Sequence, residues 1–434
     1  MEPKRPAFEP PTRRRFIAQS LAAGAALGTW RPVYGRADEE IRIGLIGAGG
    51  RGTGAAVQAL STEGPVKLVA VADAFSDRLE RSLERIVQRA DGRVEVPASA
   101  RYAGFEGYQK VLDRDDVDLV ILATPPGFRP EHFEASIEAG KHVFMEKPVA
   151  VDAPGVRRVL ATADVADSKG LRVGVGLQRH HDALYLETLR RLHAGDLGDL
   201  VALRVYWNSD GVWVRPRKSD MTEMEYQMRN WYYFNWLCGD HIVEQHIHNI
   251  DVGNWAKKAH PVKAQGQGGR QTRNGREHGE IYDHHFVEFT YADGSTMLSQ
   301  CRHMKDCWNQ VGEFAHGTAG TCNISEGFIQ RADGRVWHYD GEPQNPFQVE
   351  HDDLFSALRN DEEFNEARRG AEATMSAILG RMATYSGQEI TWEQAMESKL
   401  SLAPERMAWD ASPPSLPDAD GRYAIAMPGK GQAL

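Results

Sequence analysis

Cysteine is scarce in this sequence, and its few copies are not paired. The 434 residues contain four cysteines, and no two of them stand in a CxxC arrangement. The sequence therefore gives no sign of a zinc ribbon or a CxxC redox motif. We expect Cys238, Cys301, Cys307 and Cys322 to be small buried hydrophobes, although an oxidising compartment would allow Cys301 to pair with Cys307 or Cys322.

Apart from one N-terminal segment, the chain also lacks basic clusters and long apolar runs, and it has no internal repeats. The net charge is −10 with Lys and Arg spread along the chain, which does not match the basic stripe of a nucleic-acid-binding protein. We therefore expect a small molecule as the partner. With 41% hydrophobic residues, the chain can bury a large core, and its length predicts two domains.

The N-terminal segment is the exception. Three arginines, Arg13 to Arg15, precede a short apolar run, and the stretch Thr12 to Ile17 resembles a twin-arginine export signal. Small residues at Gly35 to Ala37 would suit cleavage. The apolar run is too short to span a bilayer comfortably, so we expect residues 1–37 to be a signal peptide rather than a stable membrane anchor. The mature protein would then be periplasmic or otherwise exported by the twin-arginine route.

The remaining chain divides into segments of different pattern. From residue 40 to 175, apolar strands alternate with helical segments, which predicts a Rossmann domain with a doubly wound parallel sheet. From 176 to 400, strands follow one another with turns between them, which predicts an α+β domain with a large open, mostly antiparallel sheet. We expect the proline-rich residues 401–434 to form an irregular tail.

A dinucleotide fingerprint follows the first strand of the Rossmann segment. GxGxxG lies between a strand and a helix, so that its glycines permit a tight turn, close approach of the pyrophosphate and packing of the helix. Asp73 ends the next strand, where it would bind the ribose hydroxyls and repel a 2′-phosphate. We therefore expect NAD rather than NADP, although Arg78 nearby weighs against this preference. The predicted cofactor-binding residues of this loop are Gly47, Gly49, Gly50, Arg51 and Gly52.

The segment AGKHVFMEKP, which contains Glu146, Lys147 and Pro148, has few parallels among Rossmann proteins. Together with the GxGxxG unit and the later His248, it resembles the Gfo/Idh/MocA oxidoreductase family over nearly all of residues 40–400. This resemblance implies an enzyme that acts on sugars, inositols or related polyols. It also implies that the open sheet forms a homo-oligomer, a dimer or a tetramer.

By the same resemblance, Lys147 lies beside the nicotinamide, and Glu146, Thr124 and Pro125 contribute to the cofactor cleft. The family's second catalytic element is an acidic residue four positions before a histidine. Glu244 and His248 have this spacing here, although the family usually has Asp at the first position.

The residue types suit the oxidation of a CHOH group. His248 would take the hydroxyl proton, and Lys147 would stabilise the developing alkoxide. Glu244, or Asp251 three residues after the histidine, could fix the imidazole tautomer. The remaining candidate substrate residues are Gln178, Arg179, Tyr233, His241 and Asp251.

The stretch CGDHIVEQHIHNID, residues 238–251, leaves other functions open. If it is one helix, His241, Gln245 and His248 share a face with Glu244 and could hold a metal ion. We expect a proton-handling stripe rather than a metal site, with His246 pointing away in a structural role.

Export adds a further alternative, because a periplasmic enzyme has no free NAD pool and must regenerate bound NAD within the turnover. An NAD-dependent glycoside hydrolase that oxidises, eliminates, adds water and reduces would satisfy this condition. A non-catalytic protein that binds sugar or NAD is the remaining class.

Overall fold

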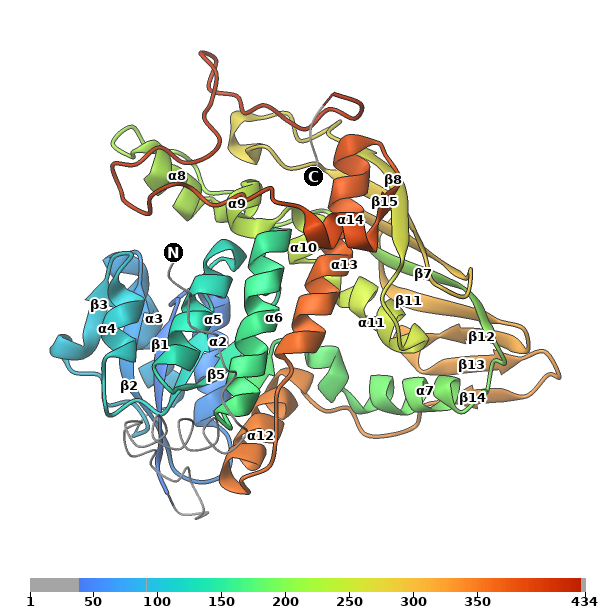
Figure 1. Ribbon diagram of the computed structural model, residues 1–434. Coiled ribbons are helices and arrows are strands. Elements are labelled where there is room, and N and C mark those ends of the chain that lie inside the picture. Colours follow the sequence, from blue (N-terminus) through green and yellow to red (C-terminus); the bar gives the residue numbers. More distant parts are fainter. Residues whose placement is uncertain (1–38, 91, 431–434) are drawn as a thin grey trace, which may run out of the picture.

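The computed structural model describes residues 39–90 and 92–430. The predicted signal peptide lies outside the described residues. The described chain forms two sheets, each covered by helices, as Figure 1 shows. None of its described helices is both long enough and apolar enough to cross a membrane.

The first sheet is the predicted Rossmann sheet. Its six strands are parallel, in the order β3-β2-β1-β4-β5-β6. Three of these strands are buried along their whole length and two more at all but one residue, because a parallel sheet carries helices on both faces. The strands are β1 (Ile41–Ile46), β2 (Val66–Asp73), β3 (Arg101–Ala103), β4 (Leu119–Leu122), β5 (His142–Met145) and β6 (Val173–Val175). The helices are α2 (Gly50–Leu60), α3 (Ser76–Arg89), α4 (Gly107–Leu112), α5 (Arg129–Glu138) and α6 (Ala153–Ser168).

The second sheet has nine strands in the order β14-β13-β12-β11-β7-β10-β9-β8-β15. All neighbours are antiparallel except β7 and β10, so the predicted fold class is confirmed and the sheet is mixed. The ADGS turn joins β9 to β10 as predicted. The strands are β7 (Leu200–Ser209), β8 (Lys263–Gly269), β9 (His284–Thr290), β10 (Thr296–His303), β11 (Gln310–Gly317), β12 (Gly320–Asn323), β13 (Phe328–Arg331), β14 (Val336–His338) and β15 (Ile390–Thr391).

Helices cover one face of this sheet and join it to the Rossmann domain (Figure 1). The long α13 packs against α6 on one side and against β8 and β9 on the other. After the strand at residues 336–338, α12 returns to the Rossmann domain and packs on α2. The helices of this half are α7 (Ala183–His193), α8 (Glu223–Arg229), α9 (Asn235–Cys238), α10 (His241–Glu244), α11 (Ile247–Lys257), α12 (Pro346–Arg359), α13 (Ala367–Ser386) and α14 (Trp392–Glu397).

The histidine-rich stretch is not the continuous helix that its pattern indicates. The one-turn helix α10 ends at Glu244, and α11 begins at Ile247 after a break at Gln245 and His246. Residues on either side of this break do not keep the helical period, so His241 and His248 do not share one face as expected.

The tail and the cysteines largely follow expectation. The described residues after Ser398 form no helix or strand, and Trp409 and Tyr423 of this segment pack into an aromatic cluster that includes Phe234. All four cysteines are free. Three of the thiols are buried as expected, but Cys307 is exposed, so the expectation of burial was wrong for it.

Buried histidines give the fold a pH dependence. Burial lowers the pKa of four of them, His132, His246, His303 and His351, to about 3. In the unfolded chain they titrate near pH 6.5, so between about pH 6.5 and 3 the unfolded state binds more protons and the folded state loses stability as the pH falls.

We therefore predict a lower melting temperature at pH 5 than at pH 7. Each of the four histidines contributes up to about 2 kcal/mol to the loss, at about 1.4 kcal/mol for each unit between its unfolded pKa and pH 5. Thermal melts followed by circular dichroism at the two pH values measure the difference in melting temperature. A melting temperature that is equal or higher at pH 5 would contradict the prediction.

Candidate active site

The glycine loop after β1 has the geometry that its sequence predicts. Gly47 has a φ of +99°, and a Cβ there would lie 2.4 Å from the backbone nitrogen of Thr124. A Cβ on Gly52 would lie 2.0 Å from the carbonyl oxygen of Gly47, so the helix can approach the strand only without a side chain. Gly49 and Gly50 differ, because a Cβ on either would meet nothing within 4 Å. They therefore face open space at the N-terminus of α2, where a pyrophosphate can approach the backbone.

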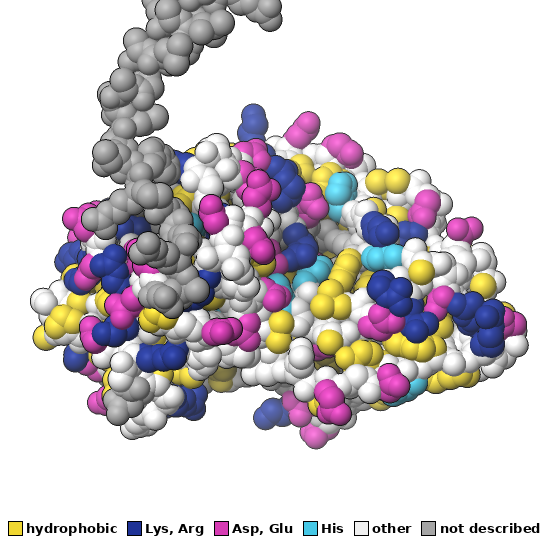
Figure 2. All heavy atoms as spheres, turned by 90° about the horizontal axis from the view of Figure 1, so that it is seen from below, with side chains coloured by type: hydrophobic (Ala, Val, Ile, Leu, Met, Phe, Trp, Pro, Cys, Tyr) yellow, Lys and Arg dark blue, Asp and Glu magenta, His cyan; other side chains and the backbone are white. Residues whose placement is uncertain are grey.

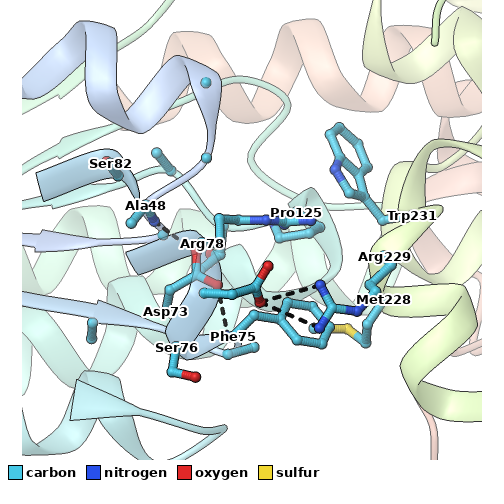
Figure 3. A pocket seen from close by; sticks show the side chains of 18 of the residues that line it. Ala48, Asp73, Phe75, Ser76, Arg78, Ser82, Pro125, Met228, Arg229 and Trp231 are labelled. Atoms are coloured by element: carbon cyan, nitrogen blue, oxygen red, sulfur yellow. Dashed lines mark hydrogen bonds and ion pairs between the residues drawn. The ribbon is translucent and has the colours of Figure 1, made fainter. Parts of the chain in front are cut away.

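Asp73 ends β2 beside this loop, as predicted. Its two carboxylate oxygens accept hydrogen bonds from the backbone nitrogens of Ala48 (2.8 Å) and Phe75 (2.9 Å), as Figure 3 shows. Burial raises the pKa of Asp73, although the positive charge of Arg78 and the two hydrogen bonds oppose that shift. The carboxylate is thus held in one orientation at the end of the strand.

A cavity of about 1240 Å³ runs along the glycine loop and the end of β2. Its Rossmann side is lined by Gly47, Gly49, Gly50, Arg51, Asp73, Thr124 and Pro125 among others, whereas Gly52, Glu146 and Lys147 are not part of the lining. Figure 3 shows Met228, Arg229 and Trp231 of the second domain facing Phe75 and Arg78 across it. The size and the open glycine backbone fit a dinucleotide.

Several arginines line the part of this cavity next to Asp73. The guanidinium of Arg229 lies 3.9 Å from the centroid of the Phe75 ring and 3.3 Å from an oxygen of Asp77. Burial and the nearby charge of Arg229 lower the pKa of Arg78, while Asp73 opposes the shift. Sequence reasoning identified Arg78 here but missed Arg229, which comes from a distant helix.

Arg51 joins the glycine helix to the segment that carries the predicted catalytic lysine. Its guanidinium lies 2.5 Å from Glu146, which follows β5, and 3.0 Å from Glu350 of α12. Burial raises the pKa of Glu350 well above its usual value, and the charge of Glu146 adds to the shift while Arg51 opposes it. On the other side of Glu146, the buried Arg129 donates from Nε to its carbonyl oxygen at 3.0 Å.

Lys147 follows Glu146 directly and reaches the second domain. Its Nζ donates to the backbone carbonyl oxygen of Glu244 at 2.6 Å and lies 3.6 Å from Glu244 Oε1. Two of the three predicted catalytic residues are therefore in contact. However, Glu244 binds Lys147 and not the His248 ring, so its expected role as the group that orients the imidazole is not what this structure contains.

His248 lies near this pair on α11 and is almost completely buried. Burial lowers its pKa well below the usual value, and the positive charges of Lys147 and Arg179 add to this effect. Among the residues that the structure describes, none is hydrogen-bonded to the His248 ring. Its imidazole is therefore neutral at physiological pH, as a proton acceptor requires.

The second candidate for orienting His248 makes a different contact. Asp251 Oδ2 lies 2.8 Å from His180 Nε2, and the His180 ring stacks on Trp255 at 4.1 Å. The expected contact between Asp251 and His248 is therefore absent from the described structure, and a contact between Asp251 and substrate stays a prediction.

The remaining predicted substrate residues differ in whether their polar groups already have partners within the described protein. Arg179 forms an ion pair with the buried Glu313, and Gln178 has a buried Oε1 that lacks a hydrogen-bond partner among the described residues. Tyr233 is fully buried, and its hydroxyl lies 3.1 Å from the carbonyl oxygen of Trp213 and also accepts from Arg273. Its hydroxyl is thus occupied within the protein, while the roles of Gln178 and Arg179 stay predictions.

His241 lies apart from His248. It belongs to a buried group with Asp240 and His285, and its ring stacks on His303 at a centroid distance of 4.4 Å. Sequence reasoning missed Asp240, His285 and His303 as partners of His241. Two of them come from β9 and β10, and only the tertiary fold brings them to α10.

Comparison with known proteins supports the interpretation of the first domain. Residues 41–177 match the Gfo/Idh/MocA family model, described as an oxidoreductase family with an NAD-binding Rossmann fold. The chain is 36% identical to inositol 2-dehydrogenase 4 of Saccharopolyspora erythraea over 167 residues, which is 37% of this chain and 43% of that protein. It is 31% identical to a glycosyl hydrolase family 109 protein of Streptomyces coelicolor over 161 residues, 37% of this chain and 32% of that protein. The matches thus span less than half of either relative.

Solved structures resemble the whole described fold. An aldose-aldose oxidoreductase from Caulobacter crescentus, complexed with glycerol, has a TM-score of 0.64 at 17% identity and covers 81% of this chain and all of its own. A scyllo-inositol dehydrogenase from Lactobacillus casei, with NAD(H) and scyllo-inositol bound, has a TM-score of 0.62 at 19% identity and covers 82% of this chain and all of its own. At these identities the likeness shows the fold alone.

The glycine loop predicts a contrast between two substitutions. Gly49→Val places its side chain in the open space beside the loop, so it should weaken binding of NADH at least tenfold while the melting temperature changes little. Gly47→Val forces a side chain against the Thr124 backbone at a positive φ, so it should lower the melting temperature markedly.

Fluorescence titration with NADH and thermal melts measure the two effects. Wild-type affinity in a folded Gly49→Val protein would contradict the placement of the pyrophosphate at this loop.

Proposed function

Because the Rossmann domain of this chain belongs to the Gfo/Idh/MocA family of NAD-binding oxidoreductases, we propose that the protein oxidises a CHOH group of a sugar, polyol or glycoside. The observation that carries this proposal is the contact of Lys147 with Glu244 beside the neutral, buried His248. A cation and a proton acceptor are thus held together in a largely buried place at the end of a parallel strand, where ligands of such sheets bind.

Each side chain has a defined part in this reaction. The neutral imidazole of His248 accepts the hydroxyl proton as the C–H hydride departs. Lys147 donates a hydrogen bond to the substrate oxygen, which loses its proton and becomes a carbonyl oxygen, so its positive charge opposes the accumulation of negative charge. A nicotinamide ring, when bound, accepts the hydride. The carboxylate and carbonyl of Glu244 hold the ammonium group of Lys147 in position.

NAD is the proposed cofactor, and NADP is the less favoured one. Asp73 presents a buried carboxylate at the end of β2, where it accepts hydrogen bonds from a ribose and repels a 2′-phosphate. Arg78 and Arg229 are close enough to attract a phosphate, but Asp73 and Asp77 lie among them and offset part of their charge.

A carbohydrate is the proposed substrate class because the relatives are an inositol dehydrogenase and a hydrolase of glycosides. The second relative supports a second candidate function, an NAD-dependent glycoside hydrolase. It would oxidise C3, remove the acidified C2 proton, expel the aglycone, add water and reduce the ketone again, so that no net redox change occurs. This cycle suits the proposed export by the twin-arginine route, because bound NAD is regenerated in each turnover.

The functional proposal is tested on the purified chain. We expect denaturation to release NAD, identified by mass spectrometry, and we expect the absorbance of the bound nucleotide at about 340 nm to rise when a reactive polyol or sugar is added. In a Lys147→Met variant, turnover should fall at least 100-fold while NADH affinity changes only a few-fold.

Lys141→Met is the matched control, because the Lys141 ammonium also donates to backbone carbonyls, but to those of Arg114 and Val117 in the Rossmann domain rather than to that of Glu244. It should keep wild-type turnover. Full turnover in Lys147→Met would contradict the mechanism.

Release of p-nitrophenol from aryl glycosides would favour the hydrolase, and its absence while bound NAD cycles on free sugars would exclude that candidate.

The exposed face of the nine-stranded sheet supports a homo-oligomer. Large apolar side chains are exposed on or beside three strands of this face, namely Phe286, Trp308 and Val336. Figure 2 shows hydrophobic side chains gathered among charged ones on the half of the molecule that holds this sheet. An apolar surface of this kind is typical of an interface.

We therefore expect the protein without residues 1–37 to sediment as a dimer or tetramer. Trp308→Glu together with Phe286→Glu should shift it towards a monomer, because two charges would be buried at the interface. Analytical ultracentrifugation measures the oligomeric state of both proteins. A monomeric wild type at micromolar concentration would contradict this arrangement.

A further inference from the structure

Three side chains of types that can bind metals converge in the second domain, outside the cavity that the dinucleotide loop lines. Asp240 and His241 lie at the start of α10, and His285 lies on β9. One ligand atom from each residue lies within 4.8 Å of the other two, and all three side chains are almost completely buried. Asp240 Oδ1 is 3.3 Å from His285 Nε2 and 3.8 Å from His241 Nε2.

The two histidine nitrogens in this group lack hydrogen-bond partners. Nε2 of His241 and Nε2 of His285 are both buried, and neither makes a hydrogen bond to any described residue. A buried polar nitrogen without a partner is costly, and proteins contain few of them. Two such atoms beside the same carboxylate oxygen therefore indicate a common ligand.

The surroundings of His285 fix which of its nitrogens can bind a cation. Nδ1 lies 2.9 Å from the hydroxyl of Thr384, and that hydroxyl donates to the carbonyl oxygens of Gly380 and Arg381. The hydroxyl oxygen therefore accepts from Nδ1–H, and in the neutral imidazole Nε2 then carries a lone pair. This lone pair and Asp240 Oδ1 would repel each other at 3.3 Å unless a proton or a metal ion lies between them. Ligand histidines commonly have their other nitrogen fixed in this way.

Asp240 is held in place by neighbouring groups as well. Its Oδ2 accepts from the backbone nitrogen of Tyr282 at 2.9 Å and from the hydroxyl of Tyr385 at 2.5 Å, while Oδ1 faces the histidines. Its φ is +76°, a conformation that costs energy for any residue except glycine. Strained backbone of this kind persists where the surrounding contacts determine it, and it is common at functional sites.

We propose that Asp240 Oδ1, His241 Nε2 and His285 Nε2 bind one divalent transition-metal ion of the zinc class. Two imidazoles and one carboxylate form a common ligand set for such ions, and these separations leave room for an ion at roughly 2 Å from each atom after a small closure. Three protein ligands leave a fourth position for water or another ligand.

This site differs from the metal face that the sequence pattern suggested. That face combined His241 with Gln245 and His248 on one helix, whereas the helix breaks after Glu244. The side chain of Gln245 is hydrogen-bonded to His303: Gln245 Oε1 lies 2.7 Å from His303 Nε2. The proposed ion therefore lies between α10 and β9, and the proposed oxidoreductase chemistry does not depend on it.

The simplest alternative is an ion pair between a protonated His285 and Asp240, with no metal. It would keep the bond from Nδ1–H to Thr384, but it would leave His241 Nε2 without a partner. The metal site gives both nitrogens a partner.

The test uses the untagged chain with Cys307→Ser, which removes the exposed thiol as a competing ligand. The protein is treated with a chelator, dialysed, and titrated with Zn²⁺ and separately with Co²⁺. We expect one Zn²⁺ per chain by elemental mass spectrometry, a visible absorption band with Co²⁺ that saturates at one equivalent, and a higher melting temperature with Zn²⁺.

Two variants and a matched control locate the site. His285→Gln and Asp240→Asn should bind Zn²⁺ at least tenfold more weakly. His284→Gln should bind like the unaltered chain, because His284 is the preceding residue on β9 and belongs to no such group. Equal binding in His285→Gln and in His284→Gln would overturn the proposal.

If a ligand variant fails to fold, the result for the chain that carries only Cys307→Ser is decisive. One-to-one uptake together with a higher melting temperature supports the site. Absence of stoichiometric uptake and of any shift with Zn²⁺ overturns it. Neither result changes the expected effect of Lys147→Met on turnover, so failure of this site is distinguishable from failure of the proposed function.

Discussion

The guanidinium of Arg51, held between the buried carboxylates of Glu146 and Glu350, joins the three segments on which the candidate active site depends. Arg51 belongs to the glycine helix, Glu146 to the loop after β5, and Glu350 to α12. Two carboxylates buried side by side repel each other strongly, so the site is stable only while the arginine lies between them. The pKa of Arg51 shows the balance: burial lowers it, but the two carboxylates raise it by more.

The position of Lys147 follows from this arrangement. Because Glu146 is held on both sides, by Arg51 at its carboxylate and by Arg129 at its carbonyl, the next residue leaves β5 in a fixed direction. That direction takes the ammonium group to the carbonyl of Glu244 at the end of α10. Positive charges also keep His248 neutral. Burial lowers its pKa, and the charges of Lys147, Arg179 and Arg51 lower it further, so the lysine that can donate a hydrogen bond also helps to keep the neighbouring histidine a proton acceptor.

The parts of the site that could be predicted are those that depend on local sequence. Gly47 and Asp73 have their roles because a turn and a strand end are specified within a few residues. Lys147 follows a strand whose C-terminal end must face the ligand side of the sheet. Glu350 could not be assigned to the site, because α12 returns to the Rossmann domain from the far end of the second sheet. The partners of His241 were missed for a related reason. The prediction assumed one helix from residue 238 to 251, but the left-handed Asp240 before α10 and the break after Glu244 give each side of the stretch its own direction.

This broken helix explains how one short stretch takes part in two arrangements of side chains. Within α10, the backbone nitrogens of Val243 and Glu244 donate to the carbonyl oxygen of Asp240, so a single turn joins the aspartate to the residue that receives Lys147. The side chain of Asp240 is directed towards β9, and the carbonyl of Glu244 towards the Rossmann domain. A continuous helix would have directed the histidines along one face and left the carbonyl of Glu244 bonded within the helix. Because the turn ends there, that carbonyl is free to accept from the lysine. The stop in the helix is therefore what allows a residue of the second domain to position Lys147, the proposed catalytic lysine of the first.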